Sequence, residues 1–140
     1  NSLVQEVIND YDFMIKKSNI SIEIQNLPII YTDKILIKNV FENLISNSIK
    51  FVQNKQNPKI NIIFEQNKLK IIDNGIPLKD QDLNMIFEPF YKVKNNENNG
   101  NGLGLYIVKL ICKKLNIKIE INNNDFDGVT ASLDLSKCLI

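Results

Sequence analysis

Three groups of residues have types and spacings that could carry chemistry, and the first lies in an amphipathic stretch at 33–52. Asn43, Asn47 and Lys50 are spaced at i, i+4 and i+7, so in a helix they lie within an arc of about 60°. Amide oxygens are hard ligands that suit Mg²⁺, and a lysine one turn on can meet a phosphate. A solvated polar face has the same pattern, and by itself the spacing favours that simpler interpretation.

The second group, Asp73-Asn74-Gly75, follows a stretch typical of a buried strand. A carboxylate in that place can accept a hydrogen bond from an exocyclic amine such as N6 of adenine. Gly75 would let a ring approach the backbone closely. A simple Asp-Asn-Gly turn is the alternative, and taken alone it is the better interpretation.

The third group is the glycine-rich run from Gly100 to Leu105, which leads into a helix-like segment. Backbone N–H groups at the start of a helix favour an anion such as phosphate. The run lacks the GxxxxGK[ST] pattern of a phosphate loop, and it does not open a strand–turn–helix unit of the dinucleotide-binding type. A lone glycine motif is therefore weak evidence.

Composition excludes several classes of function. The 140 residues contain no histidine, which rules out a Ser-His-Asp triad or a His-ligated metal within them. The net charge of +1 gives no footprint for nucleic acid, so no nucleic-acid partner is expected. The two cysteines, Cys112 and Cys138, lack metal-type spacing, and no apolar run reaches the roughly 20 residues of a membrane span. We therefore expect a domain that faces the cytoplasm, whether or not a longer protein carries a membrane anchor.

Apolar periodicity predicts the elements that position these groups. Helical spacing predicts helices over 2–17, about 33–52, 80–87 and 103–115. Thr32 or Asp33 would cap the long helix. Alternating apolar residues predict strands at 20–25, 59–65, 68–73, 118–124 and 129–135.

The segment 94–102 is polar and glycine-punctuated, which is typical of a mobile surface loop. About five strands and three helices favour an α+β fold, a two-layer sandwich whose helices cover one face of a mixed sheet. Nothing in the pattern marks a boundary, so residues 1–140 are expected to form a single domain.

Taken in order, the three groups and two further segments resemble the five sequence boxes of the GHKL ATPase superfamily. These are NLISNSIKF (43–51), DNGIP (73–77), IFEPFYK (86–92), GNGLGL (100–105) and GVT (128–130). The third box is similar to that of sensor histidine kinases in particular. The resemblance covers roughly residues 1–137 and implies the Bergerat-type ATP-binding fold.

The resemblance also implies which residues contact Mg-ATP. These are Asn43, Asn47, Lys50, Phe51, Asp73, Gly75, Pro77, Phe87, Phe90, Tyr91, Lys92, Gly100, Gly102, Leu103, Gly104, Leu105 and Thr130. In that family pattern Asn47 is the Mg²⁺ ligand, with Asn43 beside it and Lys50 near the phosphates. Asp73 binds N6 of adenine, and Thr130 supports the pocket beside it.

The lid of the family corresponds to residues 91–102. Phe87 and Phe90 would anchor its base, while Tyr91 and Lys92 would face the nucleotide. Gly102 and Gly104 would begin the closing helix against the phosphates, with Leu103 and Leu105 packed behind them.

Two positions depart from the wider pattern. Pro77 stands where a second glycine is usual, and because proline fixes φ and lacks an N–H, adenine binding would be weaker or differently shaped. Asn43 stands where ATP-hydrolysing members carry a glutamate that activates water, and an amide cannot act as a base. Glu42 lies about 100° round the helix from Asn43.

The resemblance therefore implies slow hydrolysis and transfer of the γ-phosphate to a histidine on a separate helical dimerisation domain. No catalytic base is assigned within this chain. A response regulator would be a further partner, and the isolated domain is expected to be a monomer. A serine kinase of the same superfamily and a degenerate nucleotide-sensing or docking module remain alternatives, the second supported by Pro77.

Overall fold

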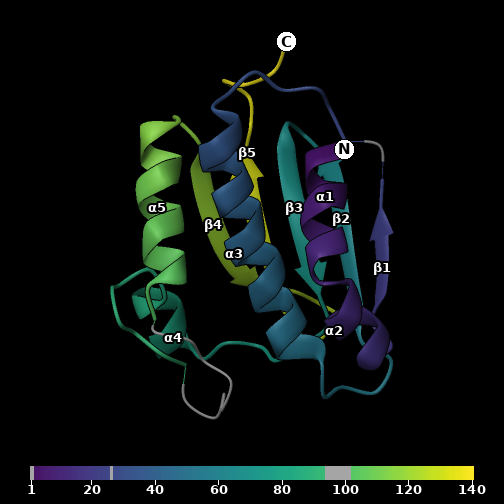
Figure 1. The fold of residues 1–140 in the computed structure, drawn as a ribbon. Coiled ribbons are helices and arrows are strands. Elements are labelled where there is room, and N and C mark those ends of the chain that lie inside the picture. The colour runs from purple at the N-terminus through teal and green to yellow at the C-terminus, as the bar shows by residue number, and fades with distance from the viewer. Residues whose placement is uncertain (1, 26, 94–101) are drawn as a thin grey trace.

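The computed structural model describes residues 2–25, 27–93 and 102–140, and its centre is a mixed sheet (Figure 1). In the described residues the sheet has five strands in the order β1-β2-β3-β5-β4. β1 and β2 are parallel, and the other neighbours are antiparallel. The strands are β1 (Ser21–Ile24), β2 (Lys59–Glu65), β3 (Lys68–Asp73), β4 (Lys118–Asn123) and β5 (Val129–Asp134). The predicted α+β class with a mixed sheet is confirmed.

The helices cover one face of this sheet, with α3 across its middle and α1 and α5 on either side (Figure 1). The described residues contain α1 (Ser2–Asp10), α2 (Asp12–Lys17), α3 (Lys34–Val52), α4 (Asp80–Met85) and α5 (Gly104–Lys114). α1, α3 and α5 correspond to the layer of about three helices that was predicted, while α2 and α4 are short.

The prediction of one helix over 2–17 is wrong at Tyr11, where the segment breaks into α1 and α2. The N–H of Tyr11 donates to Ile8 O at 3.0 Å, a three-residue step, and φ there is −107°. α1 buries Val4, Val7 and Ile8, whereas α2 buries no residue fully. The apolar spacing continues past Tyr11, and Ile15 of α2 packs against the core, while Phe13 is 74% exposed.

α3 forms because its apolar residues recur at helical spacing in a stripe and become buried against the sheet. The buried members of the stripe are Ile37, Val40, Phe41, Leu44, Ile45, Ser48, Ile49 and Val52. Asp33 caps the helix, accepting a hydrogen bond from Leu36 N at 3.0 Å, which settles the choice between Thr32 and Asp33. Among the helices of the described residues, none is both long enough and apolar enough to cross a bilayer.

Candidate functional site

Asp73 ends β3 with its carboxylate inside the protein, 4% exposed. Its Oδ1 accepts hydrogen bonds from Gly75 N at 3.0 Å and Val129 N at 3.1 Å, and the Ser48 side chain also bonds the carboxylate. Burial raises the pKa of Asp73, and these hydrogen bonds offset part of that rise. The Asp73 carboxylate is therefore a hydrogen-bond acceptor with a fixed position, buried at the C-terminal end of β3.

An apolar cavity of about 30 Å³ adjoins this carboxylate. Its lining residues are Leu44, Asn47, Ser48, Phe51, Asp73, Leu78, Ile86, Leu105, Ile121, Val129 and Ala131. That volume suits roughly two waters, so a purine ring enters only when the lining side chains move apart. One acceptor among apolar walls is the arrangement that orients a flat, partly polar ligand.

Two glycines allow the chain to pass closely here. A Cβ on Gly75 would lie 2.8 Å from Phe51 Cβ, so this glycine lets the loop after β3 pack on α3. A Cβ on Gly128 would lie 2.1 Å from Asp73 O, so only a glycine lets the turn before β5 cross Asp73. Both contacts set the position of the carboxylate.

The polar face of α3 meets the beginning of α5. Asn43 Nδ2 donates to Asn39 O at 2.9 Å, and a Cβ on Gly104 would lie 2.8 Å from Asn43 Oδ1. Asn47, one turn on, lines the cavity, and Lys50 lies a further turn on and is half-buried. The structure therefore brings Asn43 next to Gly104, with Asn47 one turn further along α3 at the cavity.

The predicted donor for a divalent cation is the amide oxygen of Asn47, which lines the cavity. In the described residues no cluster of three or more His, Cys, Asp or Glu side chains could hold a metal ion. Mg²⁺ is commonly held by one or two protein oxygens together with substrate phosphates and waters. The Asn47 amide oxygen fits that role when a nucleotide supplies the phosphates, and it does not suffice as a metal cage on its own.

Phe90 and Gly102 lie together at the two ends of the predicted lid. Phe90 N donates to Gly102 O at 2.9 Å, and both residues have positive φ, 66° and 78°. A Cβ on Gly102 would lie 2.7 Å from the carbonyl carbon of Phe90, so glycine is required there. Gly100 and the rest of the predicted loop at 94–101 lie outside the described residues.

The aromatic residues before the lid have separate surroundings. Phe87 packs against the core with the Lys109 ammonium 5.1 Å from its ring centroid, whereas Phe90 is 70% exposed. Tyr91 donates its hydroxyl to Asp82 Oδ1 at 2.5 Å, which raises the pKa of Tyr91. Tyr91 is thus tied to α4 and is not among the residues lining the cavity, and Lys92 is exposed.

Three further predicted residues complete the picture. Leu105 lines the cavity, and Leu103 directly precedes α5, which begins at Gly104. Pro77 is exposed on the loop after Asp73 and does not line the cavity, while its neighbour Leu78 does.

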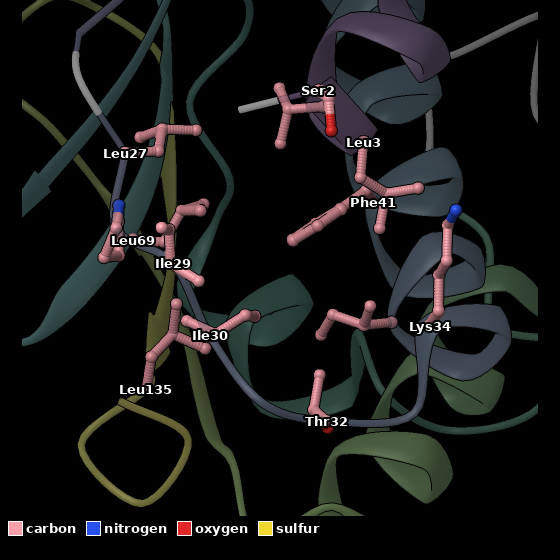
Figure 2. Close-up of a pocket in the computed structure, with 13 residues that line it drawn as sticks. Ser2, Leu3, Leu27, Ile29, Ile30, Thr32, Lys34, Phe41, Leu69 and Leu135 are labelled. Atoms are coloured by element: carbon pink, nitrogen blue, oxygen red, sulfur yellow. The ribbon is translucent and has the colours of Figure 1, made fainter. Parts of the chain in front are cut away.

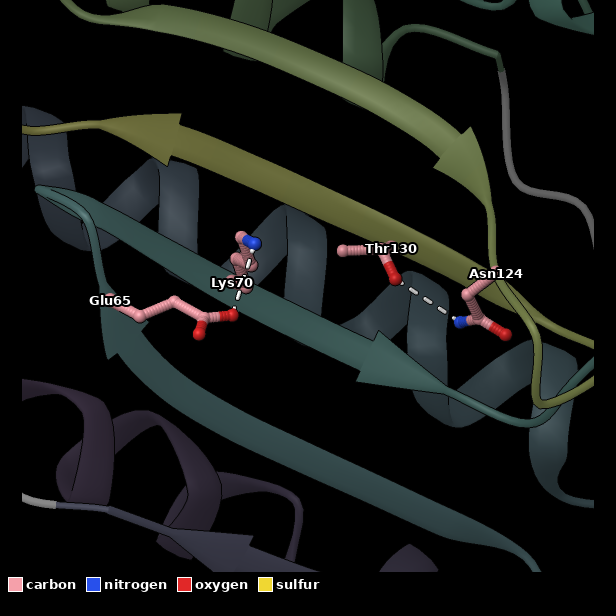
Figure 3. Close-up of polar contacts among 4 residues, drawn as sticks. All are labelled: Glu65, Lys70, Asn124 and Thr130. Carbon is pink, nitrogen blue, oxygen red and sulfur yellow. Dashed lines mark hydrogen bonds and ion pairs between the residues drawn. The ribbon is translucent and has the colours of Figure 1, made fainter.

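Thr130 does not line the cavity, and it is linked to Asp73 through Asn124, whose Nδ2 donates both to Thr130 Oγ1 and to Asp73 O. Its neighbours Val129 and Ala131 line the cavity, and since side chains alternate along a strand, Thr130 lies on the other face. Figure 3 shows Thr130 bonded to Asn124, at 3.1 Å, on the side of the sheet away from the helices, where the Glu65–Lys70 ion pair also lies. The residue of β5 that bonds Asp73 directly is Val129, through its backbone N–H.

Sequence reasoning missed several residues of the site. Ser48 is the one polar member of the buried stripe of α3, and a lone hydroxyl among apolar residues is the signal that could have marked it. Asn123 and Asn124 bond the loop after Asp73, but nothing in the run Asn122–Asn124 distinguishes its members.

A larger cavity lies at the opposite end of α3 (Figure 2). It measures about 380 Å³ and is lined by residues of α1, the segment 27–32, the first turns of α3, Leu69 and Leu135. Its walls are mostly apolar, and none of the predicted site residues lines it.

The comparisons with known proteins agree with this geometry. Residues 32–137 match the family model described as "Histidine kinase-, DNA gyrase B-, and HSP90-like ATPase". The chain is 33% identical over 136 residues to the phytochrome-like protein Cph1 of Synechocystis, covering 91% of this chain and 18% of Cph1. It is 28% identical over 139 residues to the sensor histidine kinase YxdK of Bacillus subtilis, covering 91% of this chain and 42% of YxdK. The chain therefore spans less than half the length of these curated relatives.

Solved structures give the same assignment. The catalytic domain of the histidine kinase ThkA superposes with a TM-score of 0.76 at 29% identity, covering 95% of this chain and 89% of the ThkA domain. ThkA has also been solved in complex with the response regulator protein TrrA, where the match has a TM-score of 0.73 at 26% identity and covers 95% of this chain and 39% of ThkA. The chain therefore belongs to the family of histidine kinase-, DNA gyrase B- and HSP90-like ATPases, and its relatives are sensor histidine kinases.

Proposed function

We propose that this chain binds Mg-ATP and donates the γ-phosphate to a histidine on a separate dimerisation domain, as the catalytic part of a two-component sensor histidine kinase. The observation that carries the proposal is the Asp73 carboxylate, held by two backbone N–H groups at the edge of an apolar cavity. An exocyclic amine is the complementary group for such an acceptor.

The adenine ring would take the cavity beside Asp73. Its N6 amine would donate to the carboxylate, and Phe51, Leu78 and Leu105 would contact the ring. Gly75 and Gly128 hold the carboxylate in place through the packing that their missing side chains allow. A guanine would place a carbonyl oxygen against the same carboxylate, so the pocket would prefer adenine.

The phosphates would lie between the polar face of α3 and the first turn of α5. Asn47 would bind Mg²⁺ together with the phosphates, and the ion would neutralise charge on the transferring group. Lys50 and the N–H groups near Gly102 and Gly104 would add positive potential. These groups position the γ-phosphate for in-line attack by the acceptor histidine.

Slow hydrolysis follows from the residue at position 43. Asn43 cannot accept a proton from water as a glutamate could, and its amide already donates to Asn39. Water in the site would therefore lack a base, and the phosphate would be retained until an acceptor side chain arrives.

Partners follow by similarity to the relatives. Dimerisation helices would supply the histidine, and a response regulator would then receive the phosphoryl group, as the complex of ThkA with TrrA suggests. We further propose that the chain is a single cytoplasmic domain and a monomer on its own.

The test is a calorimetric titration with a non-hydrolysable ATP analogue, with and without Mg²⁺. We expect binding to the wild-type chain, and a loss of about tenfold to a hundredfold in Asp73→Asn, because a hydrogen bond to a charged group is removed. Asp125→Asn, an exposed carboxylate close by, is the matched control and should bind like the wild type.

A degenerate docking module is the rival function, favoured by Pro77 and by the small volume of the cavity. It predicts that the wild-type chain shows no binding at millimolar nucleotide. That result would replace the kinase proposal with the docking proposal.

A further inference from the structure

The loop from Asp73 to Leu78 is held at both ends by two consecutive asparagines of the β4–β5 hairpin. Asn123, the last residue of β4, bonds the backbone of Leu78 twice. Its Oδ1 accepts from Leu78 N at 2.7 Å, and its Nδ2 donates to Leu78 O at 2.8 Å. One side chain thus satisfies both backbone groups of a residue that lines the cavity.

Asn124 holds the other end of the loop. Its Nδ2 donates to Asp73 O at 3.0 Å, and its Oδ1 accepts from Phe126 N at 2.8 Å and Gly128 N at 3.2 Å. The acceptor contacts shape the turn that brings Val129 N to Asp73 Oδ1. Asn124 therefore fixes both the backbone of Asp73 and the donor that orients its carboxylate.

We propose that Asn123 and Asn124 are positioning residues for nucleobase recognition, because they fix the acceptor and the facing apolar wall relative to one another. Asp73 supplies the acceptor, and Leu78 supplies part of the wall. The inference rests on the proposed function, since it concerns how the same pocket selects adenine. Neither asparagine is among the residues proposed to hold the phosphates.

The position of Pro77 explains why such side-chain bonds are needed. Pro77 has no N–H to donate, and it lies between Asp73 and Leu78 on a loop with little other backbone pairing. The two asparagines replace that pairing at Leu78 and Asp73. These side-chain hydrogen bonds would preorganise the loop, so that less conformational entropy is lost when the ligand binds.

The experiment measures the affinity of the 140-residue chain for ADP and for a non-hydrolysable ATP analogue in four variants. Asn123→Ala removes both bonds to Leu78. Asn124→Asp keeps the acceptor for Gly128 but loses the donor to Asp73 O, so it separates turn formation from attachment of the loop. Asn124→Ala removes both the donor to Asp73 O and the acceptor for Phe126 N and Gly128 N. Asn122→Ala is the control, since Asn122 is exposed and its side chain makes no hydrogen bond to a described residue.

We expect each of the three test variants to lose about tenfold in affinity. The loss should be the same for ADP and for the ATP analogue, because the two asparagines position the groups that contact the adenine ring, which both ligands share. In the ligand-free chain, amide exchange should accelerate at Leu78 in Asn123→Ala and at Gly128 in Asn124→Ala. Asn122→Ala should stay within about twofold of the wild type in both readouts.

Three results would overturn the inference. The first is wild-type affinity in the test variants while their amide exchange accelerates. The second is a loss for the ATP analogue without a loss for ADP. The third is a lower unfolding temperature with unchanged affinity in the folded state, which a merely structural role predicts. Absence of binding by the wild type would instead overturn the proposed function, and the inference with it.

Discussion

The carboxylate of Asp73 lies among apolar side chains, and burial raises its pKa above that of an exposed Asp. An acid whose pKa is raised in the folded state binds its proton more tightly folded than unfolded. The free energy of unfolding contributed by Asp73 therefore falls as the pH rises from the ordinary value toward the raised one, and stays low above it. The group proposed to recognise adenine thus lowers the free energy of unfolding at neutral pH.

Asp73→Asn should accordingly raise the unfolding temperature at pH 7 while it weakens nucleotide binding. The amide oxygen can still accept from Gly75 N and Val129 N, and the amide nitrogen can donate to the Ser48 hydroxyl. Thermal unfolding of both proteins is measured between pH 4 and pH 7, and the effect is the difference between them. The hydrogen bond from Lys38 lowers the pKa of Glu6, and that from Ser136 N lowers the pKa of Asp134, so these two groups have the opposite pH dependence, which cancels in the difference. A less stable variant at pH 7 would show that the hydrogen bonds outweigh desolvation.

At the scale of elements, the sequence was sufficient to predict helices and strands where the apolar periodicity was long and strong. α3 and the β2–β3 hairpin were predicted with nearly their observed bounds, because apolar spacing and strand alternation both express burial against the same core. The break at Tyr11 was not predictable, because apolar residues continue on both sides of it. At the end of α1 the N–H of Tyr11 bonds Ile8 O, three residues back, and no residue type in the sequence marks that step.

The candidate site was predictable in its segments but less so in its contacts. Asp73, Asn47, Phe51 and Leu105, which come from three of the five boxes, line one cavity. Thr130 lies on the face of the sheet opposite the cavity because side chains alternate along a strand, and its support of the pocket stays a prediction. The roles of Asn123 and Asn124 depend on where the loop after β3 passes the β4–β5 hairpin, and local sequence does not fix that.

The cap of α3 gives the prediction that belongs to this scale. Asp33→Ala should lower the free energy of unfolding by about 1 kcal/mol, because it leaves Leu36 N without its partner at the start of the longest helix. Asp33→Asn should keep nearly full stability, since Asn caps a helix about as well as Asp. Urea unfolding of both variants measures the difference. Equal losses in the two would assign the effect to the charge of Asp33.

At the scale of the whole molecule, the two ends of α3 carry different surfaces. The end near Val52 holds Asn47, Ser48 and the pocket at Asp73, with the Phe90–Gly102 pair close to the start of α5. The end near Lys34 borders the larger apolar cavity and the beginning of α1 (Figures 1 and 2). An acceptor for the phosphate would therefore have to reach the first of these ends.

These 140 residues contain no histidine, so under the proposed function the chain cannot phosphorylate itself on that residue. With γ-labelled ATP and Mg²⁺, we expect no label on the chain alone and little release of phosphate, because Asn43 provides no base for water. Adding a separately produced helical dimerisation domain that carries an acceptor histidine should give a label on that domain. The label should be lost in acid and kept in alkali, as a phosphohistidine is, and Asp73→Asn should reduce it by about tenfold to a hundredfold at ATP concentrations below the dissociation constant. An acid-stable label on a serine of any protein present would instead identify a serine kinase of the same family.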